Sequence, residues 1–321
     1  MKKKISIFII SIFSLLLFSQ TIVTYPATLE NLIYEHELIK FYINQDEFEL
    51  AISIADSVYD ESFYPDSLKY FKGLAYNGLK HWESSSSIFS DIFINGKDEG
   101  LIPIAKNEFN KSVKKLGPTK SIEKITAIID SIDNVSKHPE LFLTMAEIYE
   151  ENQLFEEANE VYKFLLEDLK YDKVLSIKLK IATNDIFIKD YQHAADLLKS
   201  VIASNDSLYI EDALFFSYIA NSSINDFEEA KKSLLRLYLE FPAHRNRFEI
   251  IEGLAGIYEN FQEYLMCWYL LNELYEISSE TQKFDIHRQI DRIKKLLVQD
   301  TLTVDQFKNF KPVFEEAEDE E

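Results

Sequence analysis

A small residue recurs at nearly constant spacing through most of the chain, and this repeat constrains the fold more than any other feature. The clearest copy has Ala146 and then Tyr149, followed after a polar turn by Phe155, Ala158 and Tyr162. In the second half of each repeat, one position holds a small residue, which we call the small position. It falls at Ala51, Ser85, about Ser121, Ala158, Ala194, Ala230 and Cys267, in steps of 34, 36, 37, 36, 36 and 37 residues. A period of this size is typical of stacked structural units.

The residues between these positions predict helices. Apolar residues recur at i, i+3, i+4 and i+7 within each segment, as an amphipathic helix requires. A small residue lets two helices approach closely, and the aromatic residues fill the space beside them. Prolines fall at joints between repeats (Pro65, Pro103, Pro139 and Pro242) or at a turn within one (Pro118). None lies in a predicted helix interior, where it would cost about 3 kcal/mol.

The pattern resembles the tetratricopeptide repeat, whose period is 34 residues. The resemblance covers seven helix pairs over residues 28–277, and most copies carry two or three extra residues, which we place in turns. The third copy departs most from the pattern, with helices expected at 102–115 and 120–132. The resemblance implies an all-α, right-handed superhelical solenoid of stacked antiparallel helix pairs, here of an exported bacterial type. One helix pair cannot bury its apolar face alone, so stacking builds the core.

The two ends of the chain differ from the repeats. Lys2, Lys3 and Lys4 precede an apolar run at 5–18, which predicts a signal peptide at 1–27. The alternative is an uncleaved anchor in the inner membrane, although a spanning helix needs about 20 apolar residues. We expect a capping helix at 278–299, and we expect the acidic tail at 300–321 to be disordered. The protein is therefore expected in the periplasm or outside the cell.

Composition excludes several classes of function. Seven glycines, none of them clustered, leave no phosphate-binding loop. A single Cys excludes a disulfide framework within the chain and a cysteine-based zinc site. Because 55 acidic residues outnumber 34 basic ones, we expect no nucleic-acid partner, and membrane contact only through an uncleaved N-terminal segment.

A search for catalytic or metal-binding patterns finds none. The six histidines lie singly, and His193 is interpreted as a partly exposed helix residue without metal-binding partners. Cys267 occupies the small position of its repeat, which predicts a packing role. Acidic pairs such as Glu156 and Glu157 begin second helices, where they favour the helix dipole. We therefore predict no enzyme activity, no cofactor and no bound metal.

The resemblance implies that the first helices of the repeats line a concave groove that binds a partner. The candidate partner-binding residues are Glu140, Leu143, Glu147, Leu179, Phe187, Phe215, Ile219, Glu252 and Glu259. Such a groove would be apolar in its middle and acidic towards its flanks. It would suit a protein or peptide segment that carries apolar anchors and positive charge. The alternative interpretation is that several of these apolar residues pack between repeats.

Three functions are compatible with the sequence. The first is an extracytoplasmic scaffold or adaptor that binds another protein, for example in assembly or maintenance of the cell envelope. The second is a structural envelope protein that associates with itself through the ends of its solenoid, which light scattering would detect as a series of oligomers. The third is an enzyme with a helical-repeat body, which would need a catalytic group of residues that the sequence does not reveal.

Overall fold

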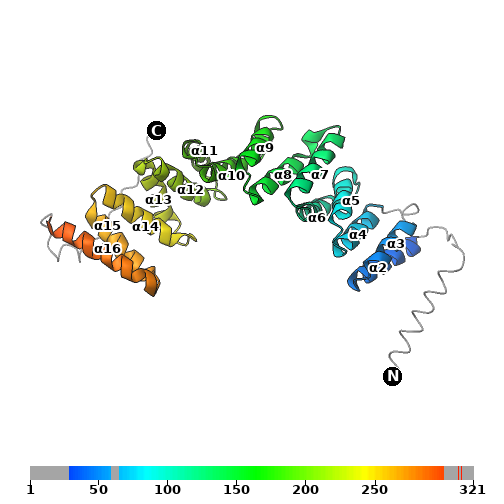
Figure 1. Ribbon diagram of the computed structural model, residues 1–321, viewed down its shortest axis with the longest axis horizontal. Helices are drawn as coiled ribbons and strands as arrows, with labels where there is room; N and C mark the ends of the chain where they lie inside the picture. Colours follow the sequence, from blue (N-terminus) through cyan, green and yellow to red (C-terminus); the bar gives the residue numbers. More distant parts are fainter. Residues whose placement is uncertain (1–28, 59–64, 300–309, 311, 313–321) are drawn as a thin grey trace, which may run out of the picture. The chain divides into compact units, whose positions relative to one another are not determined.

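A computed structural model describes residues 29–58, 65–299, 310 and 312. The predicted signal peptide and all of the predicted acidic tail except Phe310 and Pro312 lie outside the described residues. The described part contains fifteen α-helices and one short 3-10 helix but no strand (Figure 1). Within it, no helix combines the length and the apolar character needed to cross a membrane.

The chain forms two compact units, Met1–Lys124 and Ile125–Glu321, whose boundary falls inside one helix. The first unit contains α2 (Leu29–Asn44), α3 (Phe48–Val58), α4 (Pro65–Gly78), α5 (Trp82–Asn95) and α6 (Ile102–Lys114). The boundary lies in α7 (Pro118–Ser131). The second unit contains η2 (Val135–Lys137), α8 (Pro139–Glu151), α9 (Phe155–Glu167), α10 (Val174–Phe187), α11 (Tyr191–Ala203), α12 (Ile210–Ser223), α13 (Phe227–Glu240), α14 (Arg247–Asn260), α15 (Tyr264–Ile277) and α16 (Glu280–Gln299).

Within each unit, helices that follow one another in the chain pack side by side as antiparallel pairs (Figure 1). The pairs α8/α9, α10/α11, α12/α13 and α14/α15 carry the repeats of the second unit, and α16 packs on α15. The all-α repeat architecture predicted from the sequence is therefore confirmed. The third repeat differs in detail, because α7 begins at Pro118, two residues earlier than predicted. Proline is tolerated at the first helical position, where its missing N–H is not needed.

The turn inside each pair has a common backbone form. The residue two positions before the second helix has a positive φ between 59° and 67° in six pairs, at Asp46, Lys80, Gln153, Lys189, Asn225 and Gln262. The next N–H then reaches the carbonyl five residues back, as from Leu154 to Tyr149 at 2.9 Å and from Glu263 to Tyr258 at 2.8 Å. This bond satisfies a carbonyl that the end of a helix leaves unpaired. The same turn therefore closes six of the pairs without glycine.

The small position of each repeat is buried. Ala51, Ser85, Ser121, Ala158, Ala194 and Ala230 are fully shielded from solvent, and Cys267 is nearly so. The two serines replace alanine without leaving a hydroxyl unpaired, because Ser121 donates to the Val113 carbonyl at 2.6 Å and Ser85 bonds with Ser112 at 2.9 Å. The predicted repeat register therefore agrees with the packing at all seven positions.

Enlarging one of these residues should force a helix pair apart. We expect Ala158→Leu to lower the free energy of unfolding by about 1–3 kcal/mol, because the fully buried site has no room for three more carbon atoms. Urea unfolding followed by circular dichroism would measure this. Glu157→Leu, one residue earlier and exposed, is the control and should change stability by less than about 0.5 kcal/mol. Equal midpoints for Ala158→Leu and wild type would contradict the register.

Candidate functional site

The nine predicted partner-binding residues all lie on α8, α10, α12 and α14, the first helices of four successive repeats in the second unit. We call the surface formed by these nine residues the first-helix face. Its residues differ widely in exposure, and this difference separates those that can contact a partner from those that serve the fold.

Three of the apolar residues pack largely between repeats. Leu143, Leu179 and Phe215 are half-buried, and each packs against a buried core cluster. The Phe215 ring lies 5.6 Å from the ring of His244, which is itself buried. Much of the surface of these three side chains is therefore buried against the core, as the alternative interpretation expected.

Phe187 is different, because its side chain is 61% exposed at the end of α10. It stacks on Phe155 of the preceding repeat, with ring centroids 4.7 Å apart and an angle of 11° between the planes. Leu154, which is 39% exposed, precedes Phe155 in the chain. Phe187 therefore presents a large apolar surface whose orientation is held by a neighbouring ring. Ile219 of α12 is half-buried.

The four predicted acidic residues have unequal surroundings. Glu140 and Glu147 are half-buried on α8, whereas Glu252 is exposed on α14. Glu259 is paired with Arg292 of α16, where Nη2 lies 2.8 Å from Oε2 and a second contact joins Nη1 to Oε1. The charge of Glu259 therefore helps to hold the last helix on the last repeat.

Sequence reasoning did not single out Lys180, a basic residue on one of these first helices. Lys180 of α10 donates to Glu150 of α8 at 3.1 Å, and its ammonium group lies 5.6 Å from the centre of the Tyr162 ring. Tyr162 is fully buried, and its burial, followed by the charges of Glu150 and Glu147, raises its pKa. The ion pair thus joins the first helices of two successive repeats.

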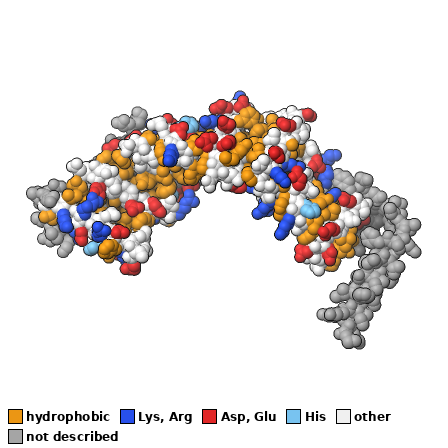
Figure 2. Space-filling view, in the orientation of Figure 1, with side chains coloured by type: hydrophobic (Ala, Val, Ile, Leu, Met, Phe, Trp, Pro, Cys, Tyr) orange, Lys and Arg blue, Asp and Glu red, His pale blue; other side chains and the backbone are white. Residues whose placement is uncertain are grey.

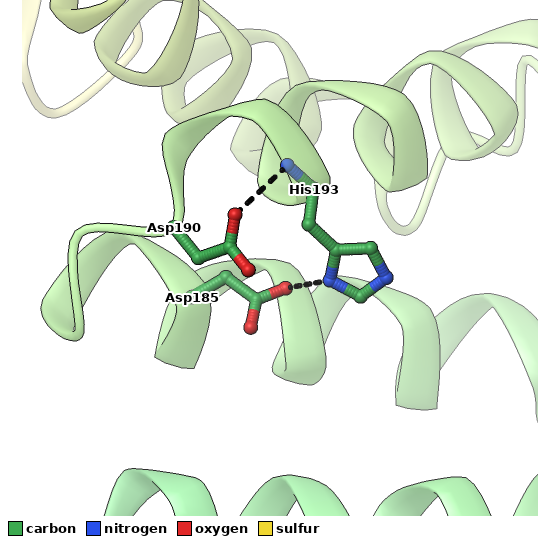
Figure 3. A group of neighbouring side chains, drawn as sticks. All are labelled: Asp185, Asp190 and His193. Carbon is green, nitrogen blue, oxygen red and sulfur yellow. Dashed lines mark hydrogen bonds and ion pairs between the residues drawn. The ribbon is translucent and has the colours of Figure 1, made fainter.

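A polar cluster lies between α9, α10 and α11 (Figure 3). The Asp185 carboxylate, whose side chain is only 3% exposed, accepts hydrogen bonds from His193 Nδ1 at 2.6 Å and from Asn159 Nδ2 at 2.8 Å. Asn184 donates in turn to Asn159 Oδ1 at 3.0 Å. Asp190 caps α11 by accepting from the backbone N–H of His193 at 3.3 Å. The cluster therefore joins two repeats through paired polar groups.

The Asp185 carboxyl is held in an unfavourable environment for a charge. Burial raises its pKa above the usual value, although the hydrogen bond and the charge of His193 act in the opposite direction. His193 is 40% exposed, and Figure 3 shows its second ring nitrogen turned away from both aspartates. The prediction that His193 is a partly exposed helix residue is confirmed, but its bond to Asp185 could not be seen in the sequence.

Asp185, Asp190 and His193 place ligand atoms within 4.8 Å of one another, which is a spacing that a metal ion could use. In the structure, however, Asp185 and His193 are bonded to each other, and the second Asp185 oxygen accepts from Asn159. These hydrogen bonds join the polar groups of the cluster to one another in a self-contained network. Cys267 is buried, and its burial raises the pKa of the thiol to about 12, so that it packs as a neutral group.

No protein-family model and no curated protein sequence matches the chain. Among solved structures, the C-terminal part of a TPR repeat-containing protein from Cytophaga hutchinsonii matches with a TM-score of 0.54 and 12% identity. That match covers 78% of this chain and 98% of the other. The chain has a tetratricopeptide-repeat fold. The apo form of RapI matches with a TM-score of 0.50 and 13% identity, over 86% of this chain and 83% of that one. At these identities the likeness concerns the fold alone.

The buried Asp185 carboxyl should change how the free energy of unfolding depends on pH. Its pKa is raised in the folded state, so its contribution to stability is complete below the unfolded pKa and is lost as pH rises through the folded pKa. The variant Asp185→Asn has no carboxyl at this position, so it does not lose stability in this way as pH rises. The free energy of unfolding of the variant should therefore rise relative to that of wild type between about pH 3 and pH 7.

Urea unfolding of both proteins across this pH range would measure the difference. Asp196→Asn, which changes an exposed aspartate on α11, is the matched control and should keep a constant difference from wild type. Parallel curves for Asp185→Asn and wild type would show that the buried carboxyl has an ordinary pKa.

Proposed function

We propose that this protein is a scaffold that binds a segment of another protein on the first-helix face of its second unit. The observation that carries the proposal is the exposed ring of Phe187, because an exposed large apolar side chain held in one orientation is a typical anchor for a partner. Its stacking on Phe155 reduces the conformational entropy that binding would remove.

The charges of the same face support a partner with positive charge. Glu252 is exposed on α14, and Glu140 and Glu147 are half-buried on α8. Acidic residues around apolar anchors mainly accelerate the encounter with a basic partner, while the anchors supply most of the affinity. We propose a partner segment with apolar side chains and Lys or Arg.

The place of action proposed here is outside the cytoplasm. The support is in the sequence, where Lys2, Lys3 and Lys4 precede the apolar run at 5–18. An exported scaffold of this kind would act in the assembly or maintenance of the cell envelope.

The binding proposal is tested by comparing two exposed aromatic residues. Phe187 and Phe284 have similar exposed fractions, 61% and 69%, but Phe284 lies on α16, which carries none of the nine residues of the first-helix face. The full chain, Phe187→Ala and Phe284→Ala would each serve as bait against membrane and soluble fractions of the source cell after chemical crosslinking. We expect a partner captured by wild type and Phe284→Ala but weakened by about 1–3 kcal/mol with Phe187→Ala.

Surface-based kinetics on the captured partner would show this loss mostly as faster dissociation. If both variants bind as wild type does, the first-helix face is not the binding surface. If the protein captures only itself, in proportion to its concentration, self-association is the better description.

Export is tested by expressing the full chain in a bacterium with a working secretion system. We expect the secreted or periplasmic protein to lack its first ~19 to 27 residues, the usual length of a signal peptide. Intact-mass spectrometry of the fractionated cells would show the shorter chain. A full-length mass in the membrane fraction would instead support an uncleaved anchor.

A further inference from the structure

The end of the chain after α16 divides into two parts of different composition. In residues 315–321, six of the seven residues are acidic, which is typical of a segment that stays solvated. In residues 300–314, which we call the C-terminal segment, two acidic residues balance two lysines. Its apolar residues are Leu302, Val304, Phe307, Phe310, Val313 and Phe314. The acidic composition that predicts disorder is therefore confined to 315–321, and the C-terminal segment has aromatic side chains that could be buried against a folded domain.

One residue of the C-terminal segment, Phe310, lies against the last helix pair. Its ring meets the ring of Tyr269 on α15 edge-on, with centroids 6.4 Å apart and an angle of 73° between the planes. Phe310 and Leu297 of α16 also line the same pocket. A helix that continued past α16 would place Phe310 about 20 Å beyond Leu297, because each helical residue advances about 1.5 Å. Phe310 therefore contacts α15 and does not continue the line of α16.

The pocket beside Phe310 has a volume of about 300 Å³. Its walls on α15 are the half-buried Tyr264, Leu265 and Met266, which also pack against the core cluster of the last repeats. The volume is at the lower end of the range for small-molecule pockets, about 300–1,000 Å³. One wall is the side chain of Phe310 itself. The pocket therefore suits side chains of the C-terminal segment better than a separate small molecule.

Exposed apolar surface alone would not identify a docking site on this unit. Figure 2 shows hydrophobic side chains gathered between charged ones over the C-terminal repeats on the face in view. Phe284 on α16, for example, is 69% exposed. The surface near Tyr269 is different, because a side chain from the same chain already covers part of it and is itself half-buried there.

The end of a repeat array needs a cover of this kind. Each internal repeat buries a face against the next repeat, whereas the last repeat has no further neighbour. The helix α16 supplies part of the cover, with Ile290, Ile293 and Leu297 buried in the core cluster. Leu265 and Tyr269 are four residues apart, so they are neighbours on α15, and both remain half-buried. We call the surface formed by Tyr264, Leu265, Met266 and Tyr269 the α15 site.

We propose that the C-terminal segment docks on the α15 site of its own molecule, with Phe310 as the anchor. The occupant is this segment because Phe310 already lies on Tyr269. The ten residues between Gln299 and Phe310 can span about 35 Å when extended, which is ample for the chain to return to α15. The docked segment completes the cover of the last repeat and holds the acidic residues 315–321 beside it. This inference does not depend on partner binding at the first-helix face.

Cleavage by trypsin would measure how firmly the segment is docked. Lys308 is the one trypsin site within residues 300–321, because a proline follows Lys311. The full chain and a synthetic peptide of residues 300–321 would be digested under the same conditions, and the loss of residues 309–321 would be followed by intact-mass spectrometry. We expect cleavage in the full chain to be at least about tenfold slower than in the peptide, since only the undocked fraction can enter the protease.

The variant Phe310→Ala should remove this protection. Its cleavage after Lys308 should approach that of a peptide with the same change, which corrects for any preference of trypsin near the cleaved bond. The control is Phe284→Ala, which truncates an exposed ring on α16 and should keep the rate within about twofold of wild type.

The α15 side of the contact is tested by Tyr269→Ala, which should speed cleavage after Lys308 by about fivefold. The matched control is Tyr275→Ala on the same helix. Tyr275 is also half-buried against the core cluster, but its ring lies beside His287. Tyr275→Ala should therefore leave the rate unchanged even if it lowers the melting temperature as much. The double variant Phe310→Ala with Tyr269→Ala should be cleaved no faster than Phe310→Ala alone, because both changes break one contact.

The proposal is overturned if the full chain is cleaved as fast as the peptide, or if Phe310→Ala is protected as well as wild type. It is also overturned if Tyr269→Ala and Tyr275→Ala speed cleavage equally, since protection would then follow the stability of the repeat and not the contact with Phe310. Protection that increases with protein concentration, together with a dimer mass in light scattering, would show instead that the segment docks on a second copy.

Discussion

The close contact between the two helices of each pair, made at a small residue of the second helix, is the interaction on which the rest of the structure depends. Ala158, Ala194 and Ala230 are fully buried there. A larger side chain would separate the helices and shift the first helix relative to its neighbours. The first-helix face is assembled from the first helices of four such pairs. Its shape therefore depends on buried residues that a partner cannot contact.

The helix pairs could be predicted from the sequence, whereas the backbone conformation of their turns could not. Small residues at a constant period indicate helix pairs, since spacing and side-chain volume are both visible in a sequence. The turns depend on left-handed backbone at residues such as Lys80, Gln153 and Lys189, which are not the residues expected there. The closing hydrogen bond, as from Leu154 to Tyr149, favours this conformation whatever the side chain.

The helices that carry the nine candidate residues were predictable from the sequence, but the exposure of these residues was not. Phe187 and Phe215 are the same residue type on successive first helices, yet one is exposed and the other packs against His244. The difference depends on contacts with residues of other helices, which periodicity does not specify. The pairing of Glu259 with Arg292 was hidden for the same reason, because a pattern of charges along one helix does not show which charge a neighbouring helix will neutralise.

The polar cluster and the exposed aromatic residue are linked through α10. Asp185 and Phe187 both lie near the C-terminal end of α10. Asp185 is bonded to Asn159 of α9 and His193 of α11, and Phe187 stacks on Phe155, also of α9. The two contacts with α9 restrain the end of α10 against the preceding repeat, and the bond to His193 holds it to the second helix of its own repeat. An aromatic ring held in this way loses little freedom on binding, so more of the free energy of its burial remains as affinity.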